Sequence, residues 1–118
     1  MPVKSHFQLI ANKTAVMETF DMSPSDQMVT IYSLDGKSIA LMHYCPVGNQ
    51  PHMRATPASA DLKTLDFHFT GAGNLPSLAM GHEQRLVLQF IDANHIVEHW
   101  TWRKNGKDTA MIYHLTRQ

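Results

Sequence analysis

The feature that most constrains the fold is a regular succession of short strand-like segments joined by turn-forming residues. Asp35-Gly36 separates two apolar segments, and Asn105-Gly106 separates two others. Both dipeptides tolerate the positive φ angles that type I′ hairpin turns require. Segments joined this closely pair antiparallel with their neighbours. The sequence therefore predicts an all-β antiparallel meander.

The expected strands follow one another along nearly the whole chain. They span residues 5–11, 14–20, 28–34, 38–45, 65–70, 85–91, 97–104 and 109–115. Pro46, Pro51 and Pro57 argue against a regular central strand between residues 46 and 60, although residues 53–56 could form a short edge strand. No segment predicts a long helix, and residues 76–81 could hold one helical turn at most.

The length of 118 residues fits a single domain spanning residues 1–118, large enough to bury one core. Ten Lys and Arg residues balance ten Asp and Glu residues, and the basic residues are scattered along the chain. This distribution offers no electrostatic footprint for a phosphate backbone or an anionic membrane. We therefore expect neither nucleic acid nor a membrane as a partner.

Cysteine usage and the first residues suggest a cellular location. The single cysteine cannot form an internal disulfide, and residues 1–6 lack the apolar core of a secretory signal. Apolar runs stay far below the ~18 residues that a membrane-spanning helix requires. We expect a soluble, cytoplasmic protein.

Alternation along the strands predicts which side chains face the interior, because successive residues of a strand point to opposite faces. Leu65, Phe67 and Phe69 form one inward set. The other inward sets are Ile39, Leu41, His43 and Cys45; Leu86, Leu88 and Phe90; Ile96, Glu98, Trp100 and Trp102; and Met111, Tyr113 and Leu115. The outward histidines on these strands are His68 and His99. The first three strands are too ambiguous to assign.

His43 and Cys45 lie two residues apart at the end of an apolar strand, so their side chains share a face. They could be an inner histidine beside an inert thiol, or they could line a ligand cavity. Cα atoms at this spacing lie roughly 6.6 Å apart, which strains a nucleophilic dyad. A shared metal ion fits better, but no further ligand spacing accompanies the pair. We expect no metal, no cofactor and no catalytic residue.

Glu98 falls on an apolar face, where an unpaired carboxylate is costly. It should therefore find a partner or have a raised pKa, and His43 and Tyr113 are candidate partners. A wet, passive position near the barrel mouth is the alternative. Asn49 and Gln50 could hydrogen-bond the backbone of their own loop or contact a ligand at the pocket mouth.

The residues around this loop resemble a known group of proteins. His43-Tyr44-Cys45, followed by Gly48-Asn49-Gln50-Pro51 and Met53, is similar to a string found in largely uncharacterised small bacterial lipocalin-like (calycin-like) β-barrel proteins. Shorter similarities in order and spacing extend from residue 15 to residue 117. The resemblance implies an antiparallel barrel or half-barrel with an internal ligand cavity, and it implies no catalytic residues.

The chain differs from that group at its beginning. Similar proteins start with an additional N-terminal strand region, which this sequence lacks. A barrel without an initial strand leaves unpaired backbone groups at a sheet edge, and a second copy of the chain could cover them. We therefore expect a homodimer.

Together these observations lead us to expect binding of a small apolar or amphipathic molecule in an internal cavity, without catalysis. The expected ligand-binding residues are His43, Cys45, Asn49, Gln50, Met53, Phe67, Phe69, Phe90, Glu98, Trp100, Trp102 and Tyr113. Two alternatives stay open. One is a small enzyme or metal-binding protein that uses His43, Cys45 and Glu98. The other is an interaction module that pairs through an open sheet edge.

Overall fold

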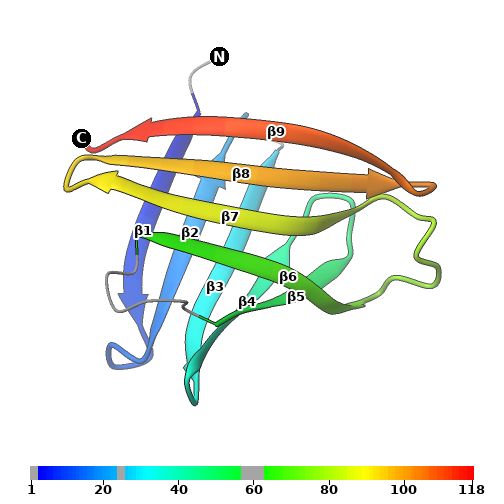
Figure 1. The fold of residues 1–118 in the computed structure, drawn as a ribbon, viewed down its shortest axis with the longest axis horizontal. Helices are drawn as coiled ribbons and strands as arrows, with labels where there is room; N and C mark the ends of the chain where they lie inside the picture. The colour runs from blue at the N-terminus through cyan, green and yellow to red at the C-terminus, as the bar shows by residue number, and fades with distance from the viewer. Residues whose placement is uncertain (1–2, 24–25, 57–62) are drawn as a thin grey trace.

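The computed structural model describes residues 3–23, 26–56 and 63–118. Within these ranges nine strands follow one another: β1 (Lys4–Ile10), β2 (Ala15–Asp21), β3 (Gln27–Asp35), β4 (Ser38–Tyr44), β5 (Gln50–Ala55), β6 (Thr64–Gly73), β7 (His82–Asp92), β8 (His95–Lys104) and β9 (Lys107–Thr116). Each strand pairs antiparallel with the next, so the sheet has the order β1 to β9 (Figure 1). The predicted all-β meander is confirmed, and no helix occurs among the described residues.

The sheet curls into a half-barrel, so that the last strands run across the direction of the first strands. In Figure 1 strands β1 to β4 run steeply, whereas β7 to β9 run across them. Aromatic side chains join the two parts: the rings of Phe20 and Tyr113 lie 4.9 Å apart, and those of Tyr32 and Phe67 lie 5.7 Å apart. β1 and β9 each pair with one neighbour in the sheet order. Among the described residues, the half-barrel therefore has two open edges.

The core lies on the concave face of the curled sheet. The alternation predicted for β4, β6, β7 and β8 is confirmed in the middle of these strands, where the buried residues include Leu41, His43, Leu65, Phe67, Leu86, Leu88, Glu98 and Trp100. It was wrong for Phe90, which is 37% exposed, and Val97 is buried although it lies on the other face of β8. The buried cluster comprises Tyr32, Leu41, Met53, Ala55, Leu65, Phe67, Leu86, Leu88 and Trp100, with Val16, Ile39, Met111 and Tyr113 packed against it. The cluster draws on strands from β3 to β8, so it holds the two parts of the sheet together.

The two glycine-containing hairpins use different turns. Asn105 and Gly106 both have positive φ angles, as the type I′ prediction requires. In the β3–β4 hairpin Asp35 pairs with Ser38, so the loop residues are Gly36 and Lys37. Of these two, Gly36 alone has a positive φ, which is the pattern of a type II′ turn. The type I′ expectation was therefore wrong for this hairpin, although the position of the hairpin was right.

The prediction that residues 46–60 form no regular central strand was wrong. β5 pairs with β4 on one side and with β6 on the other. Pro51 is tolerated because it lies just beyond the last residue pair of the β4–β5 ladder, so its missing N–H is not needed there. The register against β6 shifts at His52, where the Thr70 hydroxyl donates to the His52 carbonyl over 3.1 Å. Pro57 lies outside the described residues.

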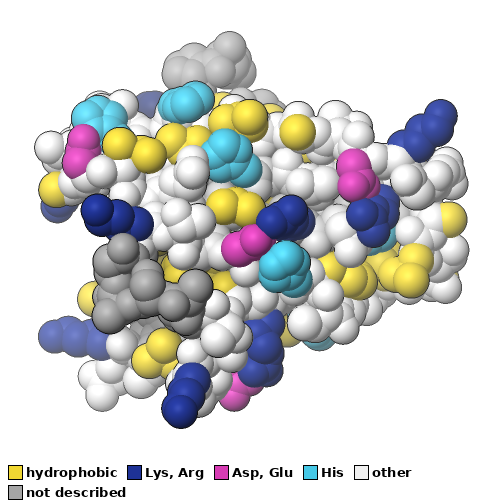
Figure 2. Space-filling view, viewed as in Figure 1, with side chains coloured by type: hydrophobic (Ala, Val, Ile, Leu, Met, Phe, Trp, Pro, Cys, Tyr) yellow, Lys and Arg dark blue, Asp and Glu magenta, His cyan; other side chains and the backbone are white. Residues whose placement is uncertain are grey.

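The surface carries dispersed charge. On the face shown in Figure 2 the Lys and Arg side chains stand singly or beside acidic residues, and they do not gather into one patch. Two of the ion pairs join neighbouring strands, Arg85 with Asp66 and Arg103 with Asp108. The described part of the chain contains no helix that could cross a membrane.

Replacing Gly81 by alanine should destabilise the fold, because the added Cβ would overlap the rigid indole of Trp102. We expect the free energy of unfolding to fall by roughly 1–3 kcal/mol, as measured by urea denaturation. Gly73→Ala is the matched control, since its Cβ would meet the mobile end of the Gln50 side chain, and it should cost less than about 1 kcal/mol. Equal losses for the two variants would contradict a specific clash at the indole.

Candidate functional site

An open pocket of about 380 Å³ lies within the half-barrel, at the end where residues flanking the β1–β2, β3–β4 and β7–β8 turns come together. Its wall is mostly apolar. The residues lining it are Phe7, Lys13, Thr14, Ala15, Val16, Tyr32, Ser33, Leu34, Ile39, Leu65, Leu88, Phe90 and Ile96. Because these residues come from seven of the nine described strands and one turn, the pocket exists only in the curled sheet.

Tyr32 connects the pocket to a polar layer in the interior. Its side chain lines the pocket, and its hydroxyl donates to Oε1 of Glu18 over 2.8 Å. Ser5 on β1 donates to the other oxygen, Oε2 of Glu18, over 2.5 Å. Burial and the neighbouring Glu18 raise the pKa of Tyr32 well above its usual value. The phenol therefore keeps its proton at neutral pH and acts as the donor to Glu18.

Glu98 on β8 faces Glu18 across the interior. Glu18 lies close enough to Glu98 to raise the pKa of Glu98. Nε1 of Trp100 donates to Oε1 of Glu98 over 2.9 Å, while Oε2 of Glu98 accepts from no donor among the described residues. Burial, and next the contact with Glu18, raise the pKa of Glu98 far above its ordinary value. Glu98 therefore keeps its proton at neutral pH.

His43 lies beside this pair on β4. Its Nδ1 contacts the Thr30 hydroxyl at 2.8 Å, and its ring lies 4.6 Å from the ring of Trp100. The Nε2 atom is buried and has no partner among the described residues. Burial lowers the pKa of His43 to about 4, so the imidazole is neutral at physiological pH. A neutral ring suits its position against the indole.

Glu83 adds a third buried carboxyl group, on β7. Its Oε2 atom has no hydrogen-bond partner among the described residues, and burial raises its pKa to about 7. The pKa of the Cys45 thiol is raised by burial and also by the nearby charge of Glu83. The pKa of Tyr113 is raised by the same causes in the same order. Glu83 therefore lies close enough to Cys45 and Tyr113 to raise the pKa of each.

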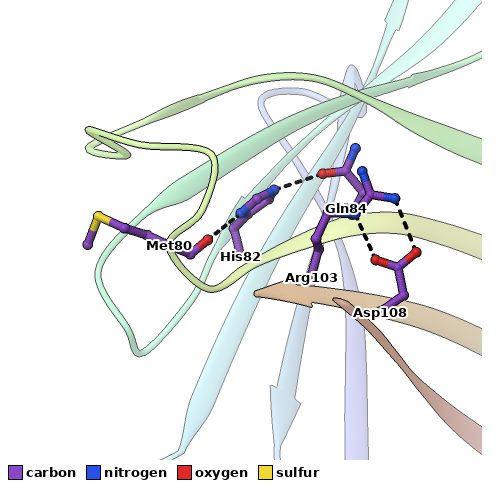
Figure 3. A network of polar contacts seen from close by, with 5 residues as sticks. All are labelled: Met80, His82, Gln84, Arg103 and Asp108. Carbon is purple, nitrogen blue, oxygen red and sulfur yellow. Dashed lines mark hydrogen bonds and ion pairs between the residues drawn. The ribbon is translucent and has the colours of Figure 1, made fainter. Parts of the chain in front are cut away.

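His82 is also buried, but local partners engage both of its ring nitrogens. Nδ1 contacts the Met80 carbonyl at 2.7 Å, and Nε2 contacts the Gln84 side chain at 2.7 Å (Figure 3). Figure 3 also shows the nearby ion pair between Arg103 and Asp108. These contacts fix the loop before β7 to the start of that strand. We therefore read His82 as a structural residue.

The expected ligand-binding residues lie in different parts of the structure. Phe90 lines the pocket, whereas the others lie elsewhere. Met53, Phe67 and Trp100 belong to the packed core, His43 and Glu98 belong to the polar layer, and Phe69 packs against the ring of His82. Trp102 packs against Gly81, and Tyr113 packs against Phe20.

The loop after β4 has mainly structural contacts. Cys45 lies just beyond the end of the strand, where its carbonyl accepts from Gly48 over 2.9 Å. Gln50 donates to the carbonyl of Gly48, as expected for a bond within its own loop. Asn49 instead donates to the Gly81 carbonyl over 2.9 Å. This bond fastens the loop to the segment that precedes β7.

The enzyme and metal-binding alternatives depend on His43, Cys45 and Glu98 acting together. In the structure these three residues have different partners. His43 contacts Thr30, Glu98 contacts Trp100 and Glu18, and Cys45 contacts its own turn. Glu18 was not among the candidate partners that the sequence offered for Glu98. In the part of the chain that the structure describes, no three His, Cys, Asp or Glu side chains lie close enough to hold a metal ion.

Sequence reasoning missed Tyr32, Phe7 and Val16, which line the pocket, and Glu18, which accepts the hydrogen bond of Tyr32. The alternation of Val16, Glu18 and Phe20 along β2 could have indicated that these side chains share the inward face. Apolar Met17 on the opposite face made that alternation ambiguous. No model of a protein family matches this chain, and neither the curated proteins nor the solved structures give a significant match. The resemblance to lipocalin-like barrels stays a prediction.

Replacing Glu83 by glutamine should change how stability depends on pH. Between pH 4.5, the ordinary pKa of the side chain, and about pH 7, the folded chain keeps the Glu83 proton that the unfolded chain releases. The contribution of Glu83 to the free energy of unfolding must therefore fall as pH rises through this window. Relative to the wild type, Glu83→Gln should gain ~3 kcal/mol of unfolding free energy from pH 4.5 to pH 7. Chemical denaturation across this range measures the difference.

His43 acts in the opposite direction on the same curve. Because its folded pKa is about 4 against an ordinary 6.5, its contribution to stability increases as pH rises through that window. The comparison of Glu83→Gln with the wild type cancels this contribution. Parallel stability curves for the two proteins would contradict a raised pKa at Glu83.

Proposed function

We propose that this chain binds a small, largely apolar molecule in the pocket of the half-barrel. The observation that carries the proposal is the pocket itself, of about 380 Å³, with a mostly apolar wall. Ligand sites in proteins typically enclose roughly 300–1,000 Å³ and combine apolar walls with a few polar groups. Tyr32, Ser33 and Thr14 supply such groups here.

The exposure of the pocket rim also supports binding. Phe7 is 41% exposed, Leu34 is 78% exposed and Phe90 is 37% exposed, and all three line the pocket. A contiguous apolar rim on a folded domain commonly marks an interaction site. Each 100 Å² of apolar surface that a ligand removes from water contributes ~2.5 kcal/mol, so covering this rim favours binding.

The proposal assigns the orienting role to Tyr32. The sequence suggested His43 with Glu98 or Tyr113, but these residues are not among those that line the pocket. Tyr32 lines it, and through Glu18 it reaches the polar layer. A ligand would therefore place one end against the ring of Tyr32 and its remaining apolar part along the rim.

Phe90→Ser should weaken binding of the neutral fluorescent probe N-phenyl-1-naphthylamine by about 5- to 10-fold, because it removes part of the apolar wall. Ile112→Ser is the matched control. Ile112 is an exposed apolar residue on β9 that does not line the pocket, so its loss should leave the affinity unchanged. Fluorescence titration measures both variants, and mass spectrometry of extracts from the purified protein identifies any bound molecule. Equal effects of the two substitutions, or no probe binding, would contradict the proposal.

We also propose that the open edges of the sheet pair with a second copy of the chain. β1 and β9 each have one strand neighbour, and β1 carries the exposed apolar residues Phe7 and Leu9 on its seven residues. An edge of this kind is a template for strand addition. The edge strand β1 is the better candidate, because Phe7 brings it next to the pocket.

Leu9→Lys should shift the chain towards the monomer, because two copies paired through β1 would bring like charges together at a desolvated edge. Sedimentation velocity across micromolar concentrations measures the association. Leu78→Lys is the control, since Leu78 is also strongly exposed but lies between β6 and β7. A wild-type protein that stays monomeric over this range would exclude the dimer.

A further inference from the structure

We propose that the preferred ligand of the pocket is an amphipathic anion, an apolar chain that ends in a carboxylate, with the chain inside the pocket and the carboxylate at Lys13. This inference rests on the proposed function, because it names the chemical class that the same pocket selects. Four observations support it: the charge of the pocket wall, the burial of its deeper part, the backbone of the β1–β2 turn, and the ion pairs around the pocket mouth.

The pocket wall carries one charged residue. Among the described residues that line the pocket, Lys13 is charged, whereas no Asp or Glu is present. Lys13 lies exposed in the β1–β2 turn. Its long, flexible side chain keeps the ammonium in water, so an anionic group can bind there without losing most of its own hydration.

The deeper wall selects the other end of the ligand. Val16, Leu65 and Leu88 line the pocket, and Leu65 and Leu88 are only 8% and 4% exposed. Moving an ionised carboxylate among such side chains is costly, whereas burying a hydrocarbon chain there is favourable. The ligand is therefore oriented with its chain inward and its carboxylate at the mouth.

The β1–β2 turn fixes the position of Lys13. Ala11, Asn12 and Lys13 have φ angles of 49°, 54° and 67°, in the left-handed region that residues with a Cβ seldom adopt. Two hydrogen bonds to the Ala11 carbonyl close the turn, one from the Thr14 N–H over 3.2 Å and one from the Thr14 hydroxyl over 2.6 Å. Strained backbone of this kind is found where a protein positions a ligand-binding group. The turn thus holds the Cα of Lys13 beside the pocket.

The acidic residues that flank the two other turns at this end already have partners. Asp35 pairs with Arg54, and a carboxylate oxygen of Asp92 lies 2.8 Å from Nδ1 of His95. Lys13 forms no ion pair with any residue that the structure describes. An anion at the mouth therefore meets an uncommitted cation, whereas an amine is repelled by it.

The test compares octanoate, octylamine and octan-1-ol, which share one chain and differ in their polar end. Each is titrated at pH 7 and low salt into the wild-type protein carrying N-phenyl-1-naphthylamine, and fluorescence measures displacement of this probe. A contact with an exposed charge changes affinity only a few-fold. Because attraction of octanoate adds to repulsion of octylamine, octanoate should bind about 10-fold more tightly than octylamine. Salt at about 0.5 M should reduce this ratio below roughly 3-fold and change octan-1-ol binding little.

The wild-type comparison separates the inference from the proposed function. If octylamine binds as tightly as octanoate or more tightly, the inference is overturned, while displacement by octan-1-ol still supports the pocket. A ratio that does not respond to salt also overturns the inference. If none of the three compounds displaces the probe, the pocket fails together with the inference.

Two variants locate the preference. Lys13→Gln removes the charge at an exposed position, and it should reduce the ratio of octanoate to octylamine affinity below about 2-fold without changing octan-1-ol binding. Lys4→Gln is the matched control, because Lys4 is also exposed but lies opposite Asp21, at the far end of β1 from the turn. It should keep the ratio of about 10-fold. Equal ratios in the two variants would show that Lys13 does not set the preference, and would overturn the inference.

Discussion

The contact between the carboxyl groups of Glu18 and Glu98 is the interaction on which the interior depends. Glu18 lies on β2 and Glu98 on β8, so the contact joins strands far apart in the sheet order. Glu98 is protonated at neutral pH, because burial and the neighbouring Glu18 raise its pKa. With that proton in place, Glu18 accepts hydrogen bonds from Tyr32 and Ser5 while Trp100 donates to Glu98. The two carboxyl groups and their hydrogen-bond donors thereby link β1, β2, β3 and β8.

The registers of the first strands arrange the interior in layers. Val16 lies opposite Tyr32, and Tyr32 lies opposite Leu41, which gives an apolar layer beside the pocket. One step further along the barrel, Glu18 lies opposite Thr30 and Thr30 opposite His43. This second layer is polar and buried. Tyr32 joins the layers, since its ring belongs to the apolar one and its hydroxyl reaches the polar one.

The meander topology explains why the half-barrel combines a closed core with open edges. Each strand pairs with its neighbour in the chain, so among the described strands only β1 and β9 are left with one partner. The rings of Phe20 and Tyr113 pack across the gap between these ends without closing the sheet through backbone hydrogen bonds. The pocket lies where residues of β1 and β8 approach each other, close to this opening. The proposed ligand access and the proposed strand addition therefore involve the same side of the molecule.

The sequence by itself determined most of the strands and, for several of them, which side chains point into the interior. The Asn105-Gly106 turn and the alternation along β6 and β8 are local properties, because the backbone conformation of a turn and the two-residue period of a strand need no distant partner. The inward position of Glu98 and its raised pKa were accessible in the same way. β5 was missed because the cost of Pro51 depends on which ladder position it occupies, and only the pairing of β4 decides that.

Only the tertiary structure decided what Glu98 contacts and where the pocket lies. The partner Glu18 comes from a strand 80 residues earlier, and the pocket wall draws on Phe7, Tyr32 and Phe90 from three distant segments. Alternation fixes the face of a side chain but not the opposing surface. That surface depends on how far the sheet curls, and the curl follows from the packing of side chains between strands that are not neighbours.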